Sequence, residues 1–204
     1  MKTNISSRAA ALAAAIAFYT LPVAVAAPPE GAPPPPPSEP GMKHMEDIQE
    51  LIAVISPVSG SNVRGTVLFE KDGDRVKITV KVGGFEPNSK HAIHIHEFGN
   101  ISSTDGTSAG GHFNPEGHPH GLPDSKMRHP GDFGNLEADA NGNATLTLTL
   151  DGLMLAHGKT AIIGRAVVIH AKPDDGSQPT GNAGDRIGVG VIGVSKVMPP
   201  PEKK

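Results

Sequence analysis

The sequence predicts an all-β domain, built as a sandwich or a barrel, on two observations. Short runs rich in β-branched residues recur along the chain, and two of them, Arg75–Val82 and Thr145–Leu150, alternate between apolar and polar residues. Such alternation is typical of half-buried strands. Turn sequences, including Lys71–Asp74 and Asn141–Asn143, separate the runs, and no segment has convincing helical periodicity. Many short strands joined by turns favour a sandwich or barrel.

The first 27 of the 204 residues differ from the rest of the chain. Two basic residues precede a largely apolar run, and Ala24–Ala26 fits the small-residue pattern of a cleavage site. Residues 1–27 are therefore predicted to be a secretory signal peptide, which makes the protein exported, either periplasmic or extracellular. The alternative is an uncleaved anchor helix, because the apolar run approaches the length that spans a bilayer. Thr20 and Pro22 weaken that helix.

Proline marks both borders of the predicted domain. Residues 28–45 contain a proline-dominated run and are expected to form an extended linker. Residues 198–204 form a charged tail that opens with prolines. Residues 46–197 lie between them and form one domain, large enough to bury about two-thirds of its unfolded surface. Aromatic residues make up only 3% of the chain, so its core must consist of Val, Ile, Leu and Ala.

The expected strands follow one another along this domain and are separated by turns and loops. They cover residues 51–55, 66–70, 76–82, 144–150, 166–169 and 189–194. Residues 99–136 have no strand pattern and are rich in Gly, Pro, His and Asp. A loop of this length inside a compact domain is expected to be functional or to be ordered by a metal.

Charge and cysteine content exclude several classes of function. The formal net charge is −3 and no basic run is present, which argues against nucleic acid and against an anionic membrane surface as partners. No membrane contact beyond export is expected. The chain has no cysteine, which excludes disulfides, thiolate metal sites and cysteine nucleophiles. Any metal site must use nitrogen and oxygen ligands.

Histidines provide such ligands in two places. His94 and His96 end an apolar run, and residues two apart on a strand share a face, so their imidazoles converge as a chelating pair must. An isolated pair would more simply be two polar residues on a solvent-facing side. His170 ends another apolar run and would complete a nitrogen-only set that suits Cu(II).

The long loop provides the second set. It contains four histidines followed by a carboxylate: His112, His118, His120, His129 and Asp132. Three imidazoles and a carboxylate suit a closed tetrahedral zinc site without thiolates. The alternative is a solvated polar loop, but ordering so long a loop costs conformational entropy, and a bound metal is a physical reason for that order.

Motifs along nearly the whole domain resemble the copper/zinc superoxide dismutase family, in the order in which the family has them. They are His94–Gly99, Thr107–Pro115, Arg128–Leu136, Gly164–His170, Thr180–Arg186 and Gly190–Gly193. The resemblance implies a Greek-key β-sandwich or flattened barrel of about eight antiparallel strands with long metal-binding loops. Within the family, the chain looks like an exported bacterial-type, cysteine-free variant.

The resemblance also implies a role for each site residue. The implied copper ligands are His94, His96, His112 and His170. The implied zinc ligands are His112, His120, His129 and Asp132, with His112 bridging the two metals. Asp174 matches a carboxylate that links a copper-ligand histidine to a zinc-ligand histidine, here His94 and His120. Arg186 matches the arginine that attracts and positions superoxide, so Arg186 and His112 are the implied catalytic residues. His91 is expected to be structural, and His44, His118 and His157 are assigned no metal.

The implied activity is the dismutation of superoxide to oxygen and hydrogen peroxide by a redox-cycling copper with a zinc-bridged histidine. The expected partners are superoxide and, in a homodimer, a second copy of the chain. The alternative is an exported copper/zinc-binding protein on the same scaffold without significant turnover, which would have no use for Arg186. A structural or adhesive domain would have no use for the metal ligands, and the intact zinc ligands speak against a copper-only dismutase.

The chain departs from the family in two places. The family's disulfide is absent, and Gly106 and Val189 occupy the corresponding positions. A metal-free form with a mobile 99–136 loop and lower stability is therefore expected. The segment between Asp175 and Thr180 is short, so guidance of the substrate should depend more heavily on Arg186 and Lys172.

Overall fold

A computed structural model describes residues 48–195. The predicted signal peptide (1–27), linker (28–45) and tail (198–204) lie outside the described residues. The strands are β1 Glu50–Pro57, β2 Arg64–Asp72, β3 Arg75–Gly83, β4 Lys90–His96, β5 Asp132–Glu137, β6 Asn143–Leu150, β7 Ala166–His170 and β8 Arg186–Val194. A short 3-10 helix, η2, covers Thr107–Ala109. The all-β prediction is confirmed, and among the described residues no helix has the length and hydropathy to cross a membrane.

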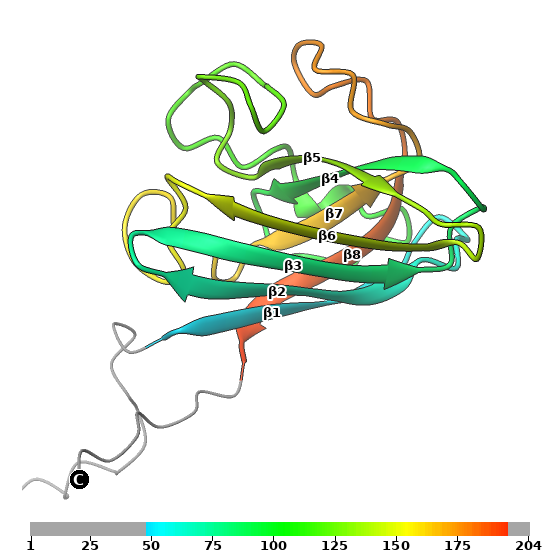
Figure 1. Ribbon diagram of the computed structural model, residues 1–204, viewed down its shortest axis with the longest axis horizontal. Helices are drawn as coiled ribbons and strands as arrows, with labels where there is room; N and C mark the ends of the chain where they lie inside the picture. The colour runs from blue at the N-terminus through cyan, green and yellow to red at the C-terminus, as the bar shows by residue number, and fades with distance from the viewer. Residues whose placement is uncertain (1–47, 196–204) are drawn as a thin grey trace, which may run out of the picture. The chain divides into compact units, whose positions relative to one another are not determined.

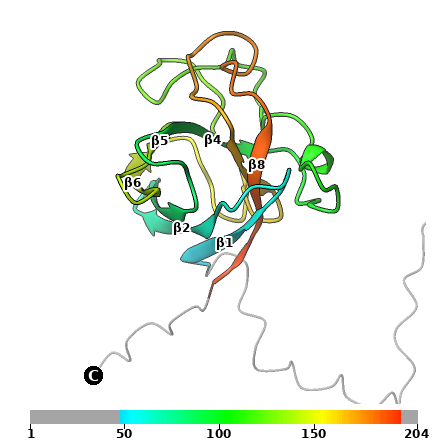
Figure 2. The same ribbon diagram turned by 90° about the vertical axis from the view of Figure 1, so that its right-hand side faces the viewer.

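The strands form one antiparallel sheet in the order β5-β4-β7-β8-β1-β2-β3-β6 (Figure 1). Strands far apart in the sequence are neighbours, as in the pairs β1–β8, β3–β6 and β4–β7, which is the mark of a Greek key. The two ends of this order, β5 and β6, approach each other, so the sheet curls into a flattened barrel (Figure 2). The predicted Greek-key fold is confirmed.

Alternation along the strands places one set of side chains in the barrel. In β3, Val76, Ile78, Val80 and Val82 are buried, and the residues between them are half-buried or exposed. β4 differs, because every residue after Lys90 is buried. Ile93 and Ile95 belong to the core, so His94 and His96, which alternate with them, project from the outer face of the barrel.

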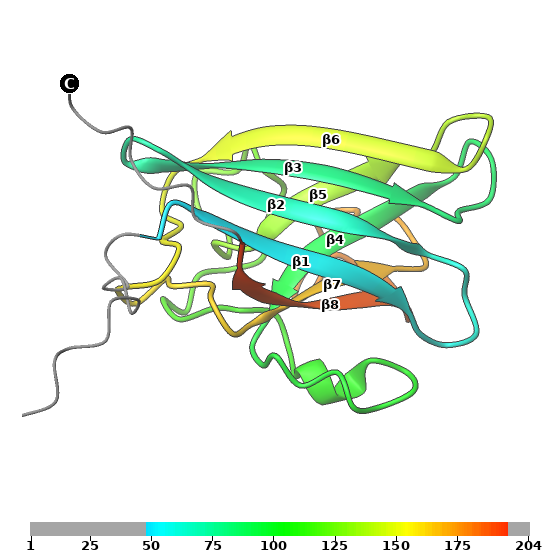
Figure 3. The same ribbon diagram turned by 90° about the horizontal axis from the view of Figure 1, so that it is seen from below.

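Long connections cover that outer face. One joins β4 to β5 through residues 97–131, and the other joins β7 to β8 through residues 171–185. Figure 3 shows the part of the first connection that contains η2 lying outside β8. Burial of the polar histidines is therefore a result of the loops, and the barrel supplies only their spacing.

β5 corrects the sequence interpretation, which placed Asp132–Leu136 in a structureless loop. These residues form a strand that pairs with β4, and the register shifts between Ala92 and His94. No alternation is visible in the sequence because Asp132, Phe133 and Gly134 are all buried in succession. The left-handed Gly134 (φ 74°) is also atypical of a strand.

Candidate metal centre

Buried polar side chains gather under the two long connections. Those with less than a tenth of their surface exposed are His91, His94, His96, His112, His120, His129, Asp132, His170 and Asp174. All except His91 are predicted site residues. Their imidazole rings contact one another, with the centroids of His94 and His112 4.2 Å apart and those of His96 and His112 5.0 Å apart. The sequence prediction therefore identified residues that the fold brings together.

Strand pairing explains how three of these histidines meet. β4 pairs with β7 so that His94 lies opposite Val168, and His170 at the end of β7 comes within 3.3 Å of His96, measured between their Nε2 atoms. His112 arrives from the connection, which runs beside β4 through a β-bridge between His96 and His112. The Phe113 amide completes this local pairing by donating to the Ile95 carbonyl at 2.9 Å.

The predicted copper ligands form one tight group. One ligand atom from each of His94, His96, His112 and His170 lies within 4.8 Å of all the others. Backbone carbonyls hold the far nitrogens of two rings: His96 Nδ1 donates to Gly110 at 2.9 Å and His170 Nδ1 to Gly184 at 3.1 Å. This fixes which ring nitrogen faces the centre of the group.

His94 shows that the group fits a metal. Its Nε2 is hydrogen-bonded to Asp174, while its Nδ1 is buried with no hydrogen-bond partner among the described residues. A buried polar atom without a partner is costly, and here it points toward other imidazole nitrogens. A set of imidazoles held in place by carbonyls and a carboxylate is suited to copper.

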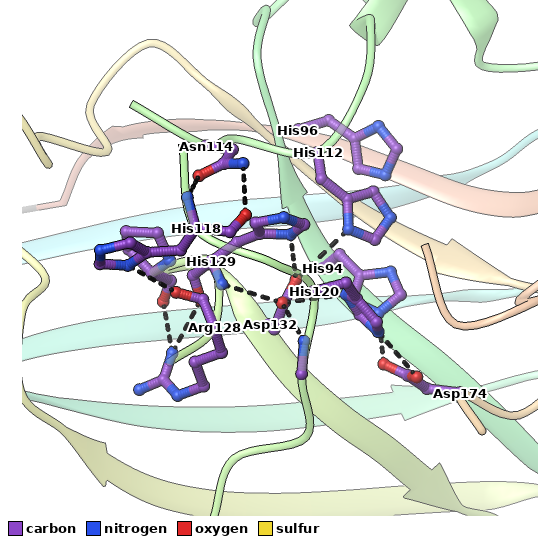
Figure 4. Close-up of polar contacts among 12 residues, drawn as sticks. His94, His96, His112, Asn114, His118, His120, Arg128, His129, Asp132 and Asp174 are labelled. Atoms are coloured by element: carbon purple, nitrogen blue, oxygen red, sulfur yellow. Dashed lines mark hydrogen bonds and ion pairs between the residues drawn. The ribbon is translucent and has the colours of Figure 1, made fainter. Parts of the chain in front are cut away.

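Asp132 is the centre of a second group (Figure 4). Its Oδ1 lies 3.1 Å from His129 Nδ1 and 3.3 Å from His112 Nδ1, and its Oδ2 lies 3.0 Å from His120 Nδ1. The His120 Nδ1 atom is buried and makes no hydrogen bond despite this proximity. Three imidazoles converging on one carboxylate match the donor set of a thiolate-free zinc site.

The two groups overlap. His94, His112, His120 and Asp132 also have ligand atoms that all lie within 4.8 Å of one another. The predicted fourth zinc ligand, His129, is absent from this tightest set and is joined to it through Asp132. His94 and His112 belong to both sets, but the Nε2 of His94 is hydrogen-bonded to Asp174, so only His112 has both ring nitrogens directed at donor groups.

Asp174 links the two groups through the Nε2 atoms of His94 and His120. Its Oδ2 accepts from His94 Nε2 at 2.8 Å, and its Oδ1 accepts from His120 Nε2 at 2.9 Å, which is the predicted pair. A Cβ atom at Gly181 would lie only 2.1 Å from Asp174 Oδ1, and Gly181 has a φ of 72°. The chain therefore requires glycine there, both for its backbone conformation and to leave room for the carboxylate.

The protonation states of the two groups differ. Burial lowers the pKa of His112 to about 4 and that of His170 to about 3, and it holds the pKa of His96 well below its usual value. These imidazoles are neutral at pH 7, as ligands must be. Burial also acts to lower the pKa of His120, but the adjacent carboxylates of Asp132 and Asp174 outweigh it and raise that pKa to about 9. Metal binding at His120 therefore releases a proton.

The two carboxyl groups are ionised. Burial acts to raise the pKa of Asp132 and of Asp174, but hydrogen bonds from the surrounding histidines hold both pKa values well below the usual range. The cluster thus combines two anionic carboxylates with imidazoles that are neutral, as at His96, His112 and His170, or that lose a proton on binding, as at His120, and this is a donor set for a divalent cation.

Arg186 lies at the start of β8, opposite His170 in the register. Its Nη1 donates to the Gly106 carbonyl and its Nη2 donates to the Gly110 carbonyl at 2.6 Å. The Gly110 carbonyl also accepts from His96 Nδ1, so the guanidinium is two hydrogen bonds away from a predicted copper ligand. Burial lowers the pKa of Arg186, yet a guanidinium remains charged at neutral pH.

The sequence interpretation missed the carbonyl groups of Gly106, Gly110 and Gly184. They hold Arg186, His96 and His170, but a backbone acceptor has no signature in residue type. Their one signal in the sequence is glycine itself, and the structure shows a positive φ (between 74° and 77°) at all three positions.

His91 and the substituted disulfide positions agree with expectation. The ring of His91 stacks on Phe85 with centroids 4.5 Å apart, and its Nδ1 is hydrogen-bonded to the His170 carbonyl at 2.8 Å, so its place is structural.

A Cβ atom at Gly106 would lie 3.0 Å from Val189 Cγ1. The two positions where the family usually has cysteines are therefore in contact.

Comparisons with known proteins agree with this geometry. Residues 63–192 match the family model described as copper/zinc superoxide dismutase. The chain is 47% identical over 158 residues to a Cu-Zn superoxide dismutase of Paramecium bursaria Chlorella virus 1, covering 74% of this chain and 82% of that protein. It is 46% identical over 157 residues to the Cu-Zn superoxide dismutase of Neurospora crassa, covering 72% of this chain and all of that protein.

A solved structure is similar as well. The crystal structure of the clock protein EA4 superposes with a TM-score of 0.67 at 38% sequence identity, covering 73% of this chain and 96% of that one.

Proposed function

The chain belongs to the copper/zinc superoxide dismutase family, and from that membership we propose which of its residues carry the reaction. It is a copper- and zinc-dependent oxidoreductase that converts two superoxide anions and two protons into one molecule of oxygen and one of hydrogen peroxide. The observation that supports the residue assignment is the pair of buried donor groups that share His112.

In this proposal the first group holds copper and the second holds zinc. The copper ligands are His94, His96, His112 and His170, and the zinc ligands are His112, His120, His129 and Asp132. Bound copper supplies the one-electron oxidation and reduction of superoxide, and bound zinc supplies a fixed positive charge beside His112.

The chain's own residues orient the ligand histidines and supply a proton to the product. Asp174 fixes the tautomers of His94 and His120, because each Nε2 must carry the proton that it donates to the carboxylate. His112 has its Nδ1 on the Asp132 side, which leaves Nε2 to hold a proton and to give it to the peroxide product. The loops over β4 bury these rings and limit the access of water.

Arg186 guides the anion. Two of its N–H groups are taken by carbonyl groups, and a guanidinium has five such donors, so others can reach a small anion. The net charge of −3 would repel superoxide. A local positive field can outweigh that repulsion.

We expect Arg186→Ala to lower kcat/KM about tenfold or more and to weaken its dependence on ionic strength, because the attracting charge is lost. The measurement is the decay of superoxide after pulse generation, at several salt concentrations and with equal copper and zinc contents. Arg186→Lys is the matched control and should retain more of the rate, since it keeps the charge. Equal rates in wild type and the alanine variant would show that Arg186 does not guide the substrate.

Export is also part of the proposal. Residues 1–27 would be removed as a signal peptide, and the mature chain would act in the periplasm or outside the cell, with residues 28–45 as a spacer before the domain. Mass spectrometry of the exported protein should find a mature start near Ala27. A full-length chain in the membrane fraction would instead support the anchor helix.

A second copy of the chain is the proposed protein partner. Val54 on β1 is 63% exposed, and Phe98 after β4 is 57% exposed. Val191 on β8 is exposed beside them, since a Cβ atom at Gly99 would touch its side chain at 3.1 Å. We define Val54, Phe98, Gly99 and Val191 as an apolar patch, with Glu97 at its edge, since the Glu97 carboxylate and the Phe98 ring both lie at the Cβ position of Gly110. Such a patch can pair with itself about a twofold axis.

Val54→Lys should weaken dimerisation about 100-fold, because a twofold axis brings two like charges into an apolar contact. Met154→Lys is the matched control, since Met154 is 48% exposed and outside the patch. Sedimentation equilibrium measures both variants. A monomeric wild-type protein, or an equally tight dimer in Val54→Lys, would refute this interface.

A further inference from the structure

The position of the Arg186 guanidinium depends on a loop. The arginine-holding loop, residues 100–110, supplies both carbonyl groups that accept from Arg186, at Gly106 and at Gly110. These carbonyls flank η2. Any change in the shape of this loop therefore moves the charge that faces the substrate.

Two serine hydroxyls close the arginine-holding loop on itself. The Ser103 amide donates to Ser108 Oγ at 3.1 Å, and the Ser108 amide donates to Ser103 Oγ at 2.9 Å. The two hydroxyl oxygens lie 3.1 Å apart, and Ser108 Oγ donates to the Asn100 carbonyl at 2.7 Å. Each side chain thus satisfies the backbone of the other, a reciprocal arrangement that fixes the residues between them.

The underside of this loop is held by packing. Gly106 faces Val189, since a Cβ atom added to it would lie 3.0 Å from Val189 Cγ1. Ala109 and Val189 belong to a small apolar cluster with Val58, Ala166 and Val168. No covalent bond ties the loop to β8, because the chain has no cysteine. Dispersion contacts limit how far the loop moves but only weakly fix the orientation of its carbonyl groups. Hydrogen bonds are directional and can fix that orientation.

We propose that Ser103 and Ser108 are positioning residues for Arg186. Their reciprocal hydrogen bonds hold the Gly106 and Gly110 carbonyls at the separation that both guanidinium nitrogens require. This inference rests on the proposed role of Arg186 and extends it, since it assigns the orientation of the anion guide to two side chains that touch neither metal group.

Ser108→Ala tests the proposal, with Ser102→Ala as the matched control. Ser102 lies in the same loop, is exposed, and bonds only to the Asn100 side chain among the described contacts. The probe is azide, a small anion, titrated by visible absorption into the copper- and zinc-loaded protein. Ser108→Ala should weaken azide binding about fivefold and lower kcat/KM for superoxide similarly, with metal content unchanged. Ser108→Thr, which keeps the hydroxyl, should retain wild-type affinity.

Two further readouts separate positioning from general damage. In an Arg186→Ala background, Ser108→Ala should cause no additional loss of azide affinity, because the guanidinium that Ser108 positions is already absent. In the metal-free protein, amide hydrogen exchange in residues 100–111 should be several-fold faster in Ser108→Ala than in Ser102→Ala.

Unchanged azide affinity in Ser108→Ala, or a loss that persists without Arg186, would overturn the positioning role. If Arg186→Ala itself leaves azide affinity unchanged, the proposed role of the arginine fails, and the inference fails with it. If Arg186→Ala weakens azide binding but Ser108→Ala does not, the role of Arg186 stands and the assignment of the serines alone is wrong.

Discussion

Replacing His112 by alanine should abolish superoxide dismutation, lowering activity by about a hundredfold or more. His112 belongs to both donor groups, so its loss removes one ligand from each metal. Its ring lies 4.2 Å from that of His94 and 5.3 Å from that of His120, measured between centroids. His94 belongs to both groups as well, but its Nε2 is hydrogen-bonded to Asp174, so it has only one nitrogen free and cannot take over both contacts.

Metal analysis of the purified variant, together with superoxide decay, measures this effect. Both copper and zinc occupancy should fall in His112→Ala. His118→Ala is the control, because His118 lies in the same connection but belongs to neither metal group, and it should keep full metal content and activity. A His112→Ala protein with wild-type metal content and rate would disprove the shared-ligand arrangement.

Removal of both metals should lower the melting temperature by roughly 10–30 °C. Each metal binds only the folded chain and adds several kcal/mol at concentrations far above its Kd, and each kcal/mol corresponds to about 2–4 °C for a domain of this size. Without the metals, the buried His120, His129 and Asp132 lose their shared cation, and the Nδ1 atom of His120 is left without a hydrogen bond among the described residues. Differential scanning calorimetry of the chelated and reconstituted protein measures the change.

Metal removal should also act unevenly along the long connection. Residues 113–131 depend on Asp132, whose Oδ2 accepts from the amides of Gly121 and His129 at 3.2 and 3.1 Å. Residues 100–110 have their own serine hydrogen bonds. We therefore expect hydrogen exchange to quicken in 113–131 and to change little in 100–110, which narrows the sequence-based expectation that the whole 99–136 loop is mobile without metals. Equal protection of 113–131 with and without metals would mean that packing alone orders it.

The fold and the donor set were predictable because their signals are local. Alternation in Arg75–Val82 identified β3, and the two-residue spacing of His94 and His96 gave them one face of β4. Long loops cover that face. The histidine and glycine content of residues 99–136 predicted in part that this loop is functional.

Other features were not predictable because they depend on three-dimensional contacts. β5 has no alternating pattern, since the loops cover its outer side and the barrel its inner side. The carbonyls that hold Arg186 belong to glycines, whose side chains reveal nothing. The reciprocal bonds of Ser103 and Ser108 arise from a loop shape that two serines five residues apart do not specify.

The most direct test of the account is the decay of superoxide in the presence of the purified mature protein loaded with one copper and one zinc. The account predicts second-order decay near the diffusional ceiling, lost when copper is removed and reduced in Arg186→Ala. Stoichiometric binding of both metals without any acceleration of superoxide decay would contradict it, and would identify the chain as a metal-binding relative that has kept the ligands without the chemistry.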